Sequence, residues 1–337
     1  MSDWTIWTEK EKGAGAGIGL SHFLHRGGND GRNVQCHRRT KRYAKFHLPV
    51  PYSAEISREQ PTAFLFLLDQ SASMQDPFGG AEQKGDAAPS KARVLADTVN
   101  ELLQNLVLRC AKEEGVRDYF HVGVIGYGER VQRLIQPADG HGTGTGLVPI
   151  SHLADRPRRM EERVQEVPDG DGGTTEQRVK RPIWFDPQAK NGTPMCQALD
   201  LGAQSVRQWI DEHPRSFPPV VVNVTDGEAT DGDPLRYAQQ LREFATDDGE
   251  VLLFNVHLSE SEATPVELPS SRDELPSDAE YAETLFQMTS RLPFSMRSAA
   301  EQEGYTVTLD TRGFVFNADP SALVTFLEIG TRPSNLR

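Results

Sequence analysis

Short apolar runs alternate with longer segments of helical periodicity along most of this 337-residue chain, and this alternation limits the folds open to it. The runs AFLFLL at 63–68 and VVVNVT at 220–225 are too short for core helices and fit strands that are buried on both faces. Strands that alternate with helices form a mostly parallel sheet with helices on both of its faces. We therefore predict a doubly wound α/β fold.

Capping residues and periodicity place two helices and a hairpin. Apolar residues recur at helical spacing from Ser90 onward, with Ser90 as the expected N-cap. A helix at 194–209 is expected to have Thr193 as its N-cap and Pro194 at its first position. Residues 120–127 and 131–135 flank a Gly-Glu-Arg turn, which predicts a hairpin and one antiparallel edge strand. Further helices are expected from 233, near 279–290, at 295–303 and from 319, and further strands at 251–257 and 313–316.

The chain is expected to divide into unequal parts. Residues 1–60 form an irregular, basic N-terminal arm, residues 61–331 form the α/β domain, and 332–337 form a short tail. Within the domain, residues 137–189 interrupt the strand–helix rhythm with glycine-rich tips. The end of this segment is tied to Thr193, so we interpret it as an insertion near the ligand-binding face.

Charge and cysteine content limit the compartment and the partners. The net charge is −13, which argues against broad nucleic-acid binding because phosphate contacts need a basic surface. Residues 1–50 nevertheless carry a net +5, which leaves −18 on the rest of the chain. Three scattered cysteines form no disulfide framework, and no run approaches the ~18 apolar residues of a membrane span. We expect a soluble cytoplasmic protein with no membrane contact.

Three loops with oxygen-bearing side chains are expected at the carboxyl ends of the strands, which is where a doubly wound sheet binds its ligands. Asp69, Ser71 and Ser73 come directly after the first strand, and their spacing by two lets one tight turn direct three side chains to one centre. Thr193 stands at a helix start, and Asp226 follows the VVVNVT strand. Carboxylates and hydroxyls are hard ligands, which suit Mg²⁺, Mn²⁺ or Ca²⁺ rather than zinc.

These five residues resemble the metal-ion-dependent adhesion site (MIDAS) of von Willebrand factor A (VWA) domains, and the resemblance covers roughly residues 61–331. It implies that Ser71 and Ser73 bind one cation, expected to be Mg²⁺, directly through their hydroxyls. Asp69 would act mostly through water, while Thr193 and Asp226 would alternate between direct and water-mediated contact. The cation would then bind a Glu or Asp of a partner protein, which is recognition rather than bond breaking.

The C-terminal stretch GFVFNADP at 313–320, with IGT at 329–331, resembles bacterial VWA proteins of stress-response and defence operons. That resemblance implies a multi-protein system inside the cell. The implied partners are an operon-encoded kinase, phosphatase or ATPase.

Two other functions remain open at this stage. In the first, the metal activates water for hydrolysis, and His141 or His152 of the insertion supplies the general base. In the second, the metal is structural and the basic arm binds nucleic acid. A third pattern, which resembles the motifs of subtilisin-like proteases, places Pro194 where the nucleophile would stand, and proline cannot act as one. We therefore expect a binding module and not an enzyme.

Overall fold

The computed structural model describes residues 51–78, 88–136, 144–168, 174–258, 264–277 and 280–331. Most of the expected N-terminal arm and the whole expected tail at 332–337 lie outside these described residues. Within the described ranges, no helix has the length and apolar character needed to cross a bilayer.

The main sheet contains eight strands of the described chain, in the order β13-β14-β12-β9-β1-β4-β5, with β6 beside β4. These strands are β1 (Thr62–Asp69), β4 (Phe120–Tyr127), β5 (Val131–Arg133), β6 (Val148–Pro149), β9 (Val220–Thr225), β12 (Leu252–His257), β13 (Val266–Glu267) and β14 (Phe314–Phe316). Strands β14, β12, β9, β1 and β4 pair in parallel, and β5 and β6 pair antiparallel with β4. The predicted mostly parallel sheet with an antiparallel edge strand is confirmed. β13 is a second antiparallel edge strand, and the sequence did not predict it because two residues are too few to show an alternating apolar pattern.

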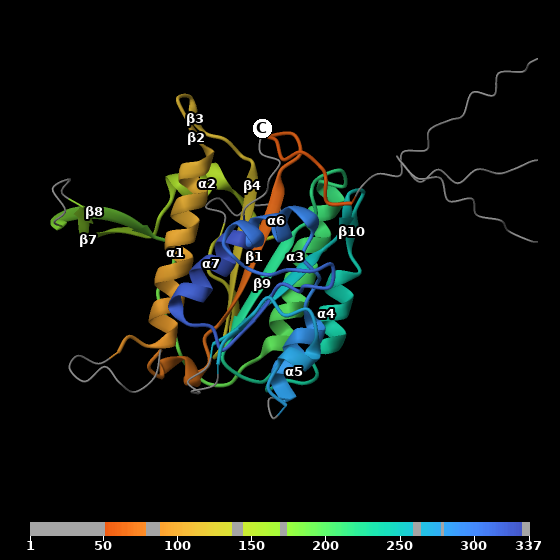
Figure 1. Ribbon diagram of the computed structural model, residues 1–337. Coiled ribbons are helices and arrows are strands. Elements are labelled where there is room, and N and C mark those ends of the chain that lie inside the picture. Colours follow the sequence, from red (N-terminus) through yellow and green to blue (C-terminus); the bar gives the residue numbers. More distant parts are fainter. Residues whose placement is uncertain are drawn as a thin grey trace, which may run out of the picture. The chain divides into compact units, whose positions relative to one another are not determined.

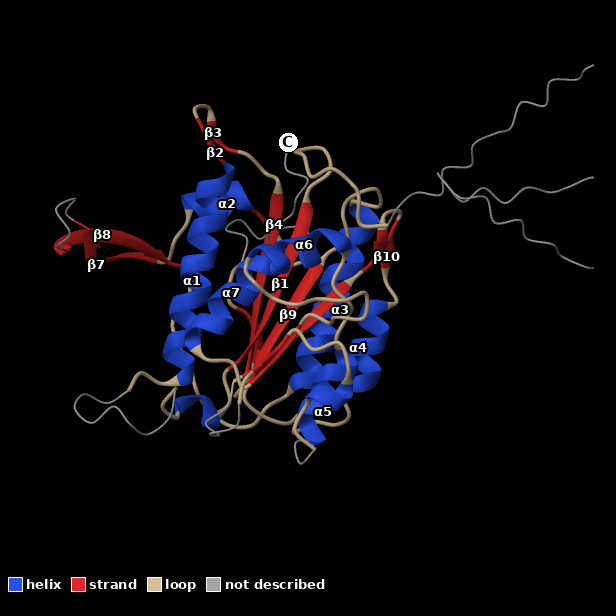
Figure 2. Ribbon diagram, viewed as in Figure 1, coloured by secondary structure: helices blue, strands red, loops and turns tan. Residues whose placement is uncertain are grey.

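Helices cover both faces of this sheet (Figure 1). They are α1 (Lys91–Cys110), α2 (Ile150–Asp155), α3 (Met195–Glu212), α4 (Leu235–Arg242), α5 (Glu280–Met288), α6 (Phe294–Gln302) and α7 (Pro320–Gly330), with 3₁₀ turns η1 (Ala72–Gln75) and η2 (Arg272–Glu274). Buried residues of α1, α2, α6 and α7 join the cluster on one face, and those of α3, α4 and α5 join the cluster on the other. Figure 2 shows the strands lying between the two layers of helices.

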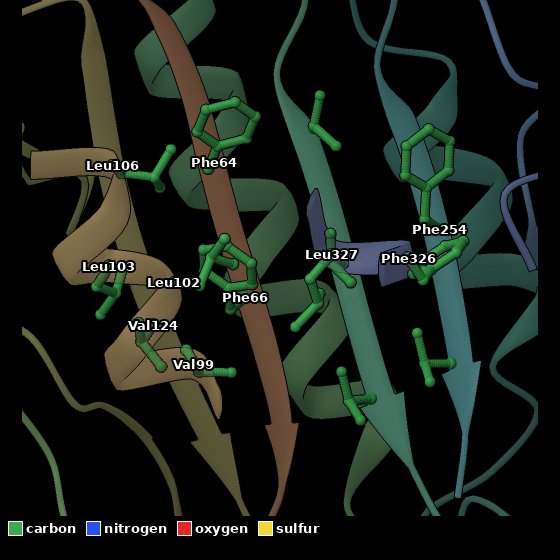
Figure 3. Packing of buried hydrophobic residues seen from close by; sticks show 14 of the residues in the cluster. Phe64, Phe66, Val99, Leu102, Leu103, Leu106, Val124, Phe254, Phe326 and Leu327 are labelled. Carbon is green, nitrogen blue, oxygen red and sulfur yellow. The ribbon is translucent and has the colours of Figure 1, made fainter. Parts of the chain in front are cut away.

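The core forms because every residue of β1 is buried and successive side chains point to opposite faces. Phe64 and Phe66 pack with α1 residues such as Leu102 on one face (Figure 3). Leu65 and Leu67 pack against the opposite cluster, where α3 lies. Burying a side chain of this size stabilises the folded state by about 1.5–3 kcal/mol.

Three two-stranded ribbons lie outside the main sheet: β2 (Ala111–Lys112) with β3 (Gly115–Val116), β7 (Arg159–Pro168) with β8 (Thr174–Ile183), and β10 (Ala245–Thr246) with β11 (Gly249–Glu250). The β7–β8 ribbon belongs to the expected insertion and lies beside α1. Its Arg163 Nη2 is 2.7 Å from Asp97 Oδ1 of that helix, and its Arg181 Nη1 is 2.9 Å from Glu101 Oε2. In the described part of the insertion, therefore, the ribbon lies along α1, and the chain reaches the ligand-binding loops just after residue 189.

Helix caps test the local predictions. The Ser90 hydroxyl accepts a hydrogen bond from the Arg93 backbone N–H at 3.3 Å, so the predicted cap of α1 is confirmed. Thr193, in contrast, does not cap α3, which begins at Met195. The Asp231 carboxylate accepts hydrogen bonds from the N–H groups of Cys196 and Gln197, each at 3.0 Å. An acidic side chain from a distant loop therefore replaces the expected local cap.

Candidate metal centre

The candidate centre lies where neighbouring parallel strands β1 and β9 end side by side, with Leu68 opposite Val224. This register brings Asp69 next to Thr225, although 156 residues separate them in sequence. The Asp69 side chain is 1% exposed, and both of its oxygens accept hydrogen bonds. Oδ1 accepts from the Ser71 backbone N–H at 2.8 Å, and Oδ2 accepts from Thr225 Oγ1 at 2.6 Å.

The two serine hydroxyls connect the first loop to the second. Ser71 Oγ and Ser73 Oγ are 3.1 Å apart, and Ser73 Oγ donates to Asp226 Oδ1 at 2.8 Å. Four of the five residues expected to bind metal, Asp69, Ser71, Ser73 and Asp226, thus lie in two loops joined by side-chain contacts. This arrangement joins the hydroxyls of Ser71 and Ser73 to a carboxylate oxygen of Asp226 through consecutive contacts.

Thr193, the fifth residue, is positioned by the backbone around it. The Ala72 N–H donates to the Asn191 carbonyl at 2.8 Å, which ties the Thr193 loop to the serine loop. Thr193 and Thr230 are also joined, because the Thr193 N–H donates to Thr230 Oγ1 at 2.9 Å. Thr193 is 6% exposed, and within the described ranges no side-chain hydrogen bond links its hydroxyl to the other four residues.

Close backbone approach requires a glycine at position 128. A Cβ atom there would lie 2.3 Å from the carbonyl oxygen of Gln70 and 3.0 Å from that of Lys190. The Lys190 N–H donates to the same Gln70 carbonyl at 2.7 Å. Gly128 therefore allows three chain segments to meet immediately behind the serine loop.

Sequence reasoning did not identify Lys91, the first residue of α1. Its Nζ lies 2.9 Å from Asp226 Oδ2, and the side chains of Lys91 and Asp226 are 4% and 0% exposed. A cation at a helix N-terminus opposes the helix dipole, so a lysine directly after the Ser90 cap is a weak sign of another role. The ammonium compensates one of the two buried carboxylates.

Burial raises the pKa of Asp69 to about 6, and the charge of Asp226 adds to the rise. Hydrogen bonds from Thr225 and Ser71 work in the opposite direction because they stabilise the ionised carboxylate. The buried carboxylates of Asp69 and Asp226 and the buried ammonium of Lys91 sum to one net negative charge. An added cation would relieve that charge.

The donor set fits a hard cation held largely by hydroxyls. Asp69 and Asp226 supply charge, and Ser71, Ser73 and Thr193 supply neutral oxygens. The part of the chain that the structure describes has no cluster of three or more His, Cys, Asp or Glu side chains. The residues therefore offer a mixed set of carboxylate and hydroxyl oxygens, which can hold a divalent cation.

Of the two histidines expected to serve as the general base for hydrolysis, His152 does not lie at this site. His152 lies on α2, which follows β6, and β6 pairs with the beginning of β4 at His121 and Val122. That end of β4 is the edge of the sheet opposite the candidate centre. The other histidine expected to act as a general base, His141, lies outside the described residues.

No protein-family model matches this chain, and no curated protein matches it in sequence. Solved structures with a similar arrangement include proximal thread matrix protein 1 from the mussel byssus, at 13% identity and a TM-score of 0.40, over 84% of this chain and 50% of that protein. A structure of the mussel protein with a zinc-occupied MIDAS motif gives the same values. A von Willebrand factor type A protein from Catenulispora acidiphila matches at 14% identity and a TM-score of 0.37, over 81% of this chain and 43% of that protein. The chain thus spans about half the length of these proteins, and values this low assign it to no family.

Proposed function

We propose that this chain is a VWA-type recognition module that holds one divalent cation at the loops after β1 and β9 and uses it to bind an acidic side chain of a partner protein. The observation that carries the proposal is the contact between these loops, in which Ser73 Oγ lies 3.1 Å from Ser71 Oγ and 2.8 Å from Asp226 Oδ1. Ser71, Ser73 and Thr193 would offer hydroxyl oxygens to the cation, and Asp69 and Asp226 would offer carboxylates. Mg²⁺ is the cation we favour, with Mn²⁺ and Ca²⁺ as alternatives.

The charge of the site supports binding of an anion. Asp69 and Asp226 carry two negative charges, and Lys91 returns one positive charge at 2.9 Å from Asp226. A bound dication would therefore leave the centre with a net charge of +1. The cation supplies an electrophilic position for an anionic oxygen, and the buried ammonium keeps that position positive.

The surroundings of the site favour a partner with mixed charge. A cavity of about 230 Å³ beside the Asp226 loop is lined by Gly227, Tyr281 and Leu285 and by the carboxylates of Glu228 and Asp233. These carboxylates would repel a second acidic residue and attract a basic one. The segment we propose for the partner thus has an acidic residue for the cation and a basic or apolar neighbour for the cavity.

We infer that the cation serves recognition and not catalysis, because the histidine that the sheet register brings beside these loops, His257, is buried. His257 pairs with Thr225 in the sheet, but it is 1% exposed, and burial lowers its pKa to about 4. An imidazole that is closed to solvent offers no nitrogen to a substrate. The resemblance of residues 313–331 supports a bacterial, cytoplasmic stress or defence system as the setting, with a kinase, phosphatase or ATPase as the partner.

Affinity capture from native cells tests the proposal. The unaltered protein in Mg²⁺ is compared with the same protein in EDTA, with Asp69→Ala, and with Asp247→Asn as a matched loss of one exposed acidic charge. We expect one partner to be captured by the unaltered protein and by Asp247→Asn in Mg²⁺, and to be lost in EDTA and with Asp69→Ala. A partner that survives both chelation and Asp69→Ala would overturn metal-dependent recognition.

A further inference from the structure

A second cavity lies at the edge of the sheet opposite the candidate metal centre. Its volume is about 670 Å³, and it is bounded by the end of α4, the beginning of β12, the chain after α5 and the beginning of α6. Four arginines contribute to its lining: Arg242, Arg291, Arg297 and Arg312. Such a density of guanidinium groups is unexpected in a chain whose net charge is −13.

Backbone carbonyls hold three of these guanidinium groups in place. Arg242 Nη1 donates to the Thr289 carbonyl at 3.0 Å, and Arg312 Nη1 donates to the same oxygen. Arg297 Nη1 donates to the Leu292 carbonyl at 2.7 Å. The Arg312 guanidinium also lies 4.9 Å from the centre of the Phe286 ring. These groups are therefore oriented by the fold and are not extended freely into solvent.

The three anchored arginines have no carboxylate within ion-pair distance among the residues that the structure describes, whereas Arg291 pairs with Asp310 at 2.8 Å. Burial lowers the pKa of Arg312, and the charges of Arg242 and Arg291 lower it further. Burial also lowers the pKa of Arg242, although the cavity-lining Glu250 and Glu243 oppose this. The lining has four arginines and two glutamates, and even with Arg291 paired to Asp310 it keeps an excess of positive charge, which an anion would compensate.

Apolar side chains stand beside the charge. Phe294 at the beginning of α6 is 77% exposed, and Leu309 is 75% exposed. Both line the cavity together with Tyr52. Large apolar side chains this exposed, next to a cavity, are typical of a surface that a ligand covers. The volume lies within the range of about 300–1,000 Å³ that small-molecule sites occupy.

We propose that this cavity binds a small phosphorylated compound of nucleotide size, with its phosphates against Arg242, Arg297 and Arg312 and its ring against Phe294 and Tyr52. Guanidinium groups match phosphate oxygens in geometry as well as charge, because each can donate two parallel hydrogen bonds. Aromatic side chains stack on the faces of bases without selecting one base. The site is independent of the metal centre, which lies at the other edge of the sheet.

Isothermal titration calorimetry on the full chain tests this site with three probes: ATP, pyrophosphate and adenosine. The titrations are made in EDTA, so that no phosphate binds through a divalent cation. We expect ATP to bind most tightly, pyrophosphate more weakly, and adenosine at least tenfold more weakly than ATP. No detectable binding of ATP or pyrophosphate would overturn the proposal.

Substitutions then locate the binding. Arg297→Gln and the double variant Arg242→Gln with Arg312→Gln should each weaken ATP binding at least tenfold. Arg272→Gln, which removes an exposed guanidinium paired with Glu283, should leave it unchanged. Because Arg242 and Arg312 also hold a backbone carbonyl, circular dichroism must first establish that the double variant is folded, and Arg297→Gln gives an independent result. If Arg297→Gln and a folded double variant both bind ATP with the affinity of the unaltered protein, the proposed site is wrong. Asp69→Ala should bind ATP as tightly as the unaltered protein does, which would show that ATP does not bind at the metal centre.

Discussion

Replacing Lys91 with methionine tests whether the buried ammonium and a divalent cation act on the same charge. Lys91 Nζ lies 2.9 Å from Asp226 Oδ2, and the two side chains are 4% and 0% exposed. Removing one member of such a pair leaves the other charge buried and unpaired, which costs about 3–5 kcal/mol. Methionine retains most of the aliphatic chain, so little packing is lost. In metal-free buffer the free energy of unfolding should therefore fall by about 3–5 kcal/mol.

Mg²⁺ should reverse much of this loss. A cation at 100 times its Kd stabilises the folded state by about 2.7 kcal/mol. The variant should bind Mg²⁺ more tightly than the unaltered protein, because no ammonium then repels the cation, and it should gain more stability from it. With Lys91 removed, two carboxylates and a dication sum to zero charge. The affinity for an acidic partner should therefore fall while the affinity for the metal rises.

Urea unfolding followed by far-ultraviolet circular dichroism measures these effects, in EDTA and in saturating Mg²⁺. Lys190→Met is the matched control, because the Lys190 side chain is 73% exposed and its Nζ is 4.0 Å from Glu129 Oε2. That exposed pair contributes about 0–1 kcal/mol, so the control should unfold almost as the unaltered protein does. Two results would refute the reasoning: no loss of stability for Lys91→Met in EDTA, or the same stabilisation by Mg²⁺ in the variant and the unaltered protein.

Three other positions have distinct expected outcomes. Ser73→Ala removes the exposed hydroxyl that donates to Asp226. Calorimetry should find the Mg²⁺ affinity reduced by about tenfold or more, while the free energy of unfolding changes by less than about 1.5 kcal/mol. An unchanged Mg²⁺ affinity would exclude Ser73 as a ligand. Thr225→Val removes the donor to Asp69 Oδ2, so the free energy of unfolding measured with urea in EDTA should fall by about 1–3 kcal/mol. An unchanged free energy of unfolding would mean that this hydrogen bond does not stabilise the fold. Burial lowers the pKa of His121 to about 4, so between pH 6.5 and 4 the unfolded chain binds more protons and stability falls as pH falls, by up to about 3 kcal/mol. His121→Phe should flatten this part of the stability curve, and an unchanged curve would contradict the lowered pKa.

The sequence was sufficient for the features that follow from strand order. Asp69 and Asp226 each stand directly after an apolar run, and parallel strands end at the same edge of a sheet, so their proximity could be predicted. Ser90 could be predicted as a cap because its hydrogen bond to Arg93 closes within one helical turn. In both cases a local pattern determines the structure.

Contacts between distant segments left no such pattern. Lys91 and Asp226 are 135 positions apart, and only packing of α1 beside β1 brings the ammonium to the carboxylate. Asp231 caps α3 from a loop 35 positions away, which is why Thr193 was wrongly expected there. The arginine cavity likewise depends on how three segments meet around one carbonyl, that of Thr289. Sequence periodicity indicates where helices and strands lie, whereas contacts between residues far apart in the sequence depend on tertiary packing.

The most direct test of the central claim is the anomalous diffraction of a crystal grown with Mn²⁺. A single Mn²⁺ peak within about 2.5 Å of Ser71 Oγ and Ser73 Oγ, in reach of Asp69, Thr193 and Asp226, is the predicted result. A crystal that binds Mn²⁺ at other residues, or that has no peak at these loops in saturating Mn²⁺, would contradict the claim that the loops after β1 and β9 hold a divalent cation.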